Sequence, residues 1–126
     1  MTDAALAAVA PASLGGLSIS VTGERSLAWS GEFAHRDPVA EVGPHVRRIH
    51  DAAAGGGELV VDVRGLAFVN SSALRVFLDW VAWIAAEPAE RRYPLRFVTS
   101  PKATWQAAAF PAIVMLGAPH VTASHG

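Results

Sequence analysis

Residues 58–64, ELVVDVR, constrain the fold more than any other segment of the chain. Their apolar side chains follow one another almost without interruption, which is typical of a central strand buried on both faces. A strand of that kind needs helices to cover the sheet, and strand-like and helix-like segments do alternate along the rest of the sequence. The alternation predicts right-handed crossovers and a mostly parallel sheet.

The other elements are predicted from periodicity and from capping residues. Residues 17–22 and 26–33 have the two-residue apolar period of half-buried strands and should form a hairpin. Asp37 and Pro38 are suited to open a helix, which the glycines from Gly55 onward should end. The later elements are a helix over 71–86, a strand over 94–99, a helix from 102 to about 109 that Pro111 should break or kink, and a last strand over 120–124. The predicted fold class is α/β, with a mixed, mostly parallel sheet of four to five strands and helices packed mainly on one face.

Residues 1–16, MTDAALAAVAPASLGG, are Ala-rich and differ from the rest. They lack a basic start, and Asp3 stands where a signal peptide would carry Lys or Arg. We expect residues 1–16 to form a flexible leader and residues 17–126 to form one domain. No apolar window approaches the length of a spanning helix, so we expect no membrane insertion and a cytoplasmic location.

Composition narrows the functional classes. The 126 residues are 52% hydrophobic and 17% charged, which is apolar enough to build a core. The net charge of -1 gives no reason to expect nucleic acid as a partner. The chain has no cysteine, which excludes disulfides, thiol catalysis and zinc–thiolate sites.

No catalytic pattern stands out. The five histidines are scattered, and the spacing of His45 and His50 puts them on different faces of a helix. The sequence holds no H-E-x-x-H, no G-x-S-x-G, no G-x-G-x-x-G and no P-loop. We therefore expect a protein that is not an enzyme and that uses no metal and no cofactor.

A hydroxyl-rich bend follows the central strand. Residues 59–78 read LVVDVRGLAFVNSSALRVFL. The strand contains Asp62, residues 66–69 make an apolar bridge, and a helix opens with the residues Asn70, Ser71, Ser72, Ala73 and Leu74. This segment resembles the signature of the STAS family, the anti-sigma-factor antagonists, in which Asp-Ser-Ser/Thr-Gly-Leu opens the helix. Asn70 and Ala73 depart from that pattern, and Asn retains the ability to cap a helix.

The resemblance implies a single STAS-like domain that binds proteins and is switched by phosphorylation. The implied modification site is Ser71, and the sequence alone does not decide between Ser71 and Ser72. The implied partners are a serine kinase that doubles as an anti-sigma factor and a PP2C-type phosphatase that resets the cycle. The alternative is a constitutive STAS-like scaffold or transport-complex subunit in which the serines act only as helix caps.

The helix over 71–86 has two apolar faces. One face should cover the sheet and carries Leu74, Phe77, Leu78, Val81 and Ile84. The other face includes two tryptophans, which are enriched in protein interfaces. We expect a docking face for a partner or a second copy of the chain, made of Asn70, Ala73, Val76, Trp80 and Trp83 beside the serines. The alternative is that a neighbouring helix or the leader covers this stripe.

Overall fold

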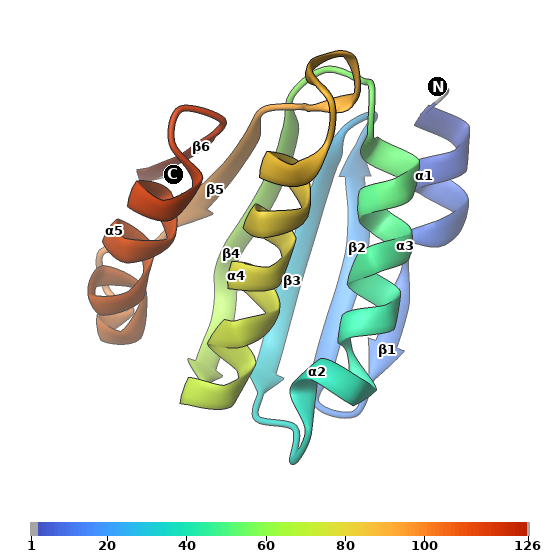
Figure 1. Cartoon of the computed structure of the whole chain (residues 1–126). Helices are drawn as coiled ribbons and strands as arrows, with labels where there is room; N and C mark the ends of the chain where they lie inside the picture. Colours follow the sequence, from blue (N-terminus) through green and yellow to red (C-terminus); the bar gives the residue numbers. More distant parts are fainter. Residues whose placement is uncertain (1–2, 126) are drawn as a thin grey trace.

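Residues 3–125, the part of the chain that the computed structural model describes, contain six strands side by side in chain order, β1-β2-β3-β4-β5-β6 (Figure 1). The strands are β1 (Ala12–Leu14), β2 (Leu17–Gly23), β3 (Ser26–Phe33), β4 (Leu59–Val69), β5 (Leu95–Thr99) and β6 (Val121–His125). The first three strands pair antiparallel, and β3 to β6 pair parallel. The prediction of an α/β fold with a mixed, mostly parallel sheet is confirmed, whereas the predicted count of four to five strands is wrong, because β1 lies in the expected leader.

The helices cover one face of this sheet. They are α1 (Asp3–Val9), α2 (Pro38–Glu41), α3 (Gly43–Ala53), α4 (Ser71–Ala86), the short 3-10 helix η1 (Ala89–Arg91) and α5 (Thr104–Gly117). Because the parallel strands follow one another in chain order, right-handed crossovers place every connecting helix on the same side. Figure 1 shows α3 and α4 in front of the sheet and α1 beside α3, and α5 packs beside α4 and on β6. Exposed side chains on β2 and β3, such as Ser18, Ser20 and Ser30, are polar, as the uncovered face requires.

The prediction that residues 1–16 form a flexible leader is wrong for the part that the structure describes. Where the structure describes it, the segment is folded: α1 packs on α3, and β1 pairs with β2 through Ala12 and Ile19. Leu6 and Ala10 are fully buried. They are four residues apart, so they share one helix face, and the surrounding alanines hide this short apolar stripe in the sequence. Residues 1 and 2 lie outside the described residues.

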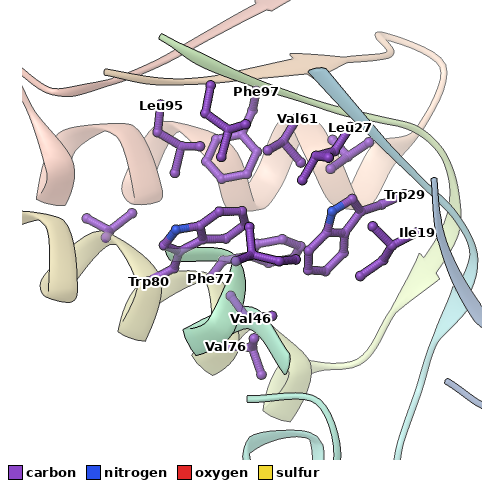
Figure 2. Close-up of a cluster of buried hydrophobic side chains, with 14 of the residues drawn as sticks. Ile19, Leu27, Trp29, Val46, Val61, Val76, Phe77, Trp80, Leu95 and Phe97 are labelled. Atoms are coloured by element: carbon purple, nitrogen blue, oxygen red, sulfur yellow. The ribbon is translucent and has the colours of Figure 1, made fainter. Parts of the chain in front are cut away.

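Aromatic side chains fill the core between the sheet and α4 (Figure 2). Trp29 of β3 stacks on Trp80 of α4 with ring centroids 6.0 Å apart. The ring centroid of Phe77 of α4 lies 5.4 Å from that of Trp29 and 5.7 Å from that of Phe97 of β5. The central helix is therefore held against the middle of the sheet, and its amino-terminal end stays fixed relative to the end of β4.

The helix predicted from Asp37 begins as expected but is divided. Asp37 accepts a hydrogen bond from Ala40 N at 3.4 Å, and Pro38 occupies the first turn. The chain then passes through Val42 and restarts as α3. Pro44 explains the division, since it has no N–H to donate to a preceding turn.

Of the predicted break or kink at Pro111, the break is wrong. Helix α5 continues through this residue to Gly117. Phe110 and Ile113, on either side of the proline, are both buried. Their burial holds the segment against the rest of the fold and outweighs the lost backbone hydrogen bond.

Candidate functional site

The serine bend lies where β4 ends and α4 begins. The side chain of Asn70 caps α4, because its Oδ1 accepts a hydrogen bond from Ala73 N at 2.7 Å. Asn70 N also donates to the carbonyl of Phe33 at the end of β3, at 3.1 Å. The bend is thus fixed both to the helix that it opens and to the neighbouring strand.

Ser71 and Ser72 are both exposed. Across the described residues, neither hydroxyl takes part in a hydrogen bond, so the cap is made by Asn70 and not by the serines. They stand in the first turn of a 16-residue helix, where backbone N–H groups have no intrahelical partner. The helix dipole gives this end a partial positive charge. We call the residues from Asn70 to Ser72 the serine corner.

The predicted docking stripe is wrong. Ala73, Val76 and Trp80 are at most 1% exposed, and Trp83 is half-buried. The guanidinium of Arg47, on α3, lies 5.2 Å from the centre of the Trp83 ring. The alternative that a neighbouring helix covers the stripe holds for Trp83, which lies against Arg47 of α3, whereas Trp80 is covered by the sheet through Trp29 and Phe97. Helix α4 has two apolar faces because α3 and α5 flank it while the sheet lies beneath it.

Two apolar side chains at the same end of the domain are exposed instead. Val39 of α2 is 43% exposed and Phe68 of β4 is 47% exposed. Phe68 is paired with exposed Glu32 and precedes Asn70 by two residues, while α2 packs against α4. The sequence pattern favours a buried position for Val39 and places Phe68 in the apolar bridge. The register of β4 against β3 shifts after Gly65, and beyond this shift Phe68 faces outward while Val69 is buried.

Asp62 does not belong to the serine corner. Its carboxylate pairs with Arg64 at 2.7 Å, and the hydrogen bond from this guanidinium holds the pKa of Asp62 below its usual range. Eight residues of extended chain separate Asp62 from Asn70, a span of about 25 Å. Asp62 is therefore a carboxylate of strand β4 that forms an ion pair with Arg64.

A second polar cluster lies between α3, α4 and the segment before β5. The Tyr93 hydroxyl is 2.8 Å from His50 Nδ1 and accepts a hydrogen bond from Trp80 Nε1 at 2.8 Å. His50 Nε2 lies 3.4 Å from Glu87 Oε2, without the alignment of a hydrogen bond. Burial lowers the pKa of His50 and raises that of Tyr93 far above its usual range. Because His50, Tyr93 and Trp80 are sealed from solvent, the cluster can join elements but cannot receive a substrate.

A groove of about 370 Å³ lies between α5 and the ends of β5 and β6. Gln106 lines it, but its side chain accepts from Ser100 N at 2.7 Å and donates to the Val63 carbonyl at 2.8 Å. Its polar atoms are thus used to attach α5 to the sheet. No three His, Cys, Asp or Glu side chains gather as a metal site would need within residues 3–125. Of the helices in this range, none has the length and apolar character needed to cross a membrane.

Comparison with family models, with curated proteins and with solved structures found no match for this chain.

Proposed function

We propose that this protein is a non-enzymatic, STAS-like regulatory module that binds a partner protein and is switched by phosphorylation at the serine corner. The observation that carries the proposal is the exposure of Ser71 and Ser72 at the amino terminus of α4, with neither hydroxyl used in a hydrogen bond within the described part of the chain. A hydroxyl in that state is open to a kinase, and its modification displaces no contact of the fold.

The helix terminus favours a phosphate there. A phosphoserine carries about −1.5 to −2 charges and three strong acceptor oxygens. At the first turn of α4 these oxygens meet unpaired N–H groups and the positive end of the helix dipole, an interaction of about 0.3–1 kcal/mol at an exposed site. Phosphorylation should therefore leave the domain folded and change the surface that a partner meets.

The partner is proposed to be a serine kinase with anti-sigma activity, and a PP2C-type phosphatase is proposed to remove the phosphate. The contact surface is proposed to comprise the serine corner with the exposed side chains of Val39 and Phe68, in place of the buried Trp80 and the half-buried Trp83. A phosphate at the serine corner would carry a hydration shell into the contact and weaken it.

The alternative is a constitutive scaffold or transport-complex subunit. This alternative gives the serines a capping role, and that role belongs to Asn70. The scaffold would thus keep the same surface but have no use for the two free hydroxyls, so the switch explains more of the serine corner.

Intact mass measured on protein purified from its own host separates the two functions. The switch predicts a fraction of molecules with one added phosphate, mapped by peptide fragmentation to Ser71 or Ser72. Ser71→Ala and Ser72→Ala, expressed in the same host, identify which residue is modified. Unmodified protein under all growth conditions contradicts the switch and favours the scaffold.

The contact surface is tested separately by Phe68→Ser and Val39→Ser. Binding of partners captured by the wild-type chain should fall at least about ten-fold if these side chains are anchors. Met115→Ser and Leu116→Ser are matched controls, because these side chains are 78% and 66% exposed and lie on α5, outside the proposed contact surface. Equal binding by all four variants refutes this placement of the surface.

A further inference from the structure

The amino-terminal arm, residues 3–14, is attached to the domain by few contacts. Leu6 of helix α1 and Ala10, the residue after it, are buried in the core, and α1 packs on α3. Strand β1 has three residues, lies at the sheet edge and pairs with β2 alone. Short terminal elements of this kind undock at lower free-energy cost than the central strands.

Two histidine rings fasten the backbone of the arm. His45 Nε2 on α3 lies 3.0 Å from the Ala10 carbonyl, and His35 Nε2 lies 2.7 Å from the Leu14 carbonyl. Because a carbonyl oxygen only accepts, each ring is the donor. The His35 ring also fits closely over the turn after β1, since a Cβ atom on Gly15 would approach Nε2 to 3.2 Å.

His35 connects the arm with the serine corner. Its carbonyl oxygen accepts a hydrogen bond from Asn70 Nδ2 at 3.2 Å, while Asn70 Oδ1 caps α4 through Ala73 N. A continuous series of contacts therefore runs from Leu14 through His35 and Asn70 to the first turn of α4.

This series gives a reason for Asn at position 70. Asp caps a helix as well as Asn does, but an ionised carboxylate has no N–H to donate. An Asn70→Asp chain would keep the bond to Ala73 N and lose the bond to the His35 carbonyl, so the helix would stay capped while its connection to the arm was cut.

We infer that the amino-terminal arm regulates the serine corner: docked, it holds the first turn of α4 through His35 and Asn70, and undocked, it loosens that turn. Coupling between two sites is reciprocal, so a change at the serine corner must alter the docking of the arm by the same factor. The inference rests on the proposed function for its consequence, which is control over how Ser71 and Ser72 are presented.

Hydrogen–deuterium exchange on the unphosphorylated full chain tests the coupling. Leu6→Ala removes the buried anchor of α1, and it should raise exchange at the Ala73 and Leu74 amides about five-fold, the loss of about one hydrogen bond. Leu116→Ala makes the same substitution at an exposed position and should leave those amides unchanged. Exchange in β5 reports general destabilisation, and the rise at Ala73 and Leu74 should exceed any rise measured there.

Asn70→Asp isolates the connection. In this variant Leu6→Ala should add nothing further to exchange at Ala73 and Leu74, and Asn70→Asp alone should raise exchange over residues 10–16. The second measurement serves even where Leu6→Ala does not fold. Two results overturn the inference. One is a Leu6→Ala protein in which amide exchange rises in the arm but not in the first turn of α4. The other is an Asn70→Asp protein in which the arm exchanges as in the wild type. Neither result depends on whether Ser71 is ever phosphorylated, so failure of the coupling and failure of the switch are distinguishable.

Discussion

Replacing Tyr93 by phenylalanine removes one hydroxyl group that two buried side chains share. Trp80 Nε1 donates to this oxygen and His50 Nδ1 lies against it, each at 2.8 Å. All three residues are at most 1% exposed, so water cannot replace the lost partner. Leaving a buried polar atom unsatisfied costs about 1–3 kcal/mol, and two such atoms give about 2–4 kcal/mol if the site relaxes in part. That is a large share of the roughly 5–15 kcal/mol that stabilises a typical domain.

Urea unfolding followed by tryptophan fluorescence and by far-ultraviolet circular dichroism measures this loss. With a slope typical of small domains, the midpoint of Tyr93→Phe should fall by about 1–2 M at unchanged slope. Ser72→Ala is the matched control, since it deletes an exposed hydroxyl without a partner among the described residues and should stay within about 0.5 kcal/mol of wild type. A double-mutant cycle with His50→Leu should show a smaller cost for Tyr93→Phe, because one orphaned atom is gone. A Tyr93→Phe protein as stable as the control would refute the reasoning.

Three further outcomes are expected. Burial lowers the pKa of His50 below 6.5, so the unfolded chain binds more protons than the native one. This contribution to stability is complete above pH 6.5 and declines as the pH falls towards the lowered native pKa. His50→Leu should therefore flatten this part of a stability–pH curve. Asn70→Ala should cost about 1–2 kcal/mol in urea unfolding, because it removes both the cap and the bond to His35, and a loss below about 0.3 kcal/mol would contradict this placement. Gly31→Ala should destabilise the domain by more than about 2 kcal/mol in thermal unfolding, since φ of Gly31 is +93° and the added Cβ would overlap the carbonyl oxygen of Gly16. A wild-type melting temperature would contradict this, because it would show that the hairpin can shift to accept a side chain.

The central strand and the helix after it are predictable because their signals are local, although the strand continues to Val69 through the residues predicted as an apolar bridge. An unbroken apolar strand, a capping residue and a helical period lie next to one another, and α4 spans the predicted residues 71–86. The strand β1 is not predictable, because Ala12–Leu14 has only three residues, lies between Pro11 and Gly15, and gains its pairing only from β2.

The site is predictable in position but not in detail. Three capping residues stand in a row, and only the backbone geometry selects Asn70 as the cap. The sequence favours an exposed position for Trp80 and Trp83 because the helix period reveals two apolar faces without showing how many neighbours a helix has. The contact between His50 and Tyr93 joins residues 43 apart, a separation over which a single sequence carries no pairing signal.

The location of Ser71 and Ser72 limits how a phosphate there could act. Both hydroxyls are exposed, so a phosphate removes no contact of the core, and the dipole of α4 stabilises it rather than expelling it. If phosphorylation changed nothing beyond Ser71 and Ser72, the partner would have to recognise the phosphate by direct contact alone. Asn70 offers a second route, because it caps the same turn and donates to the His35 carbonyl. A phosphate that draws the first-turn N–H groups towards itself competes with Asn70 Oδ1 for Ala73 N, and any shift of Asn70 is felt by His35 and by the Leu14 carbonyl. Phosphorylation should therefore raise amide exchange over residues 10–16 in the intact chain, and an arm unchanged by a stoichiometric phosphate would confine the signal to the surface.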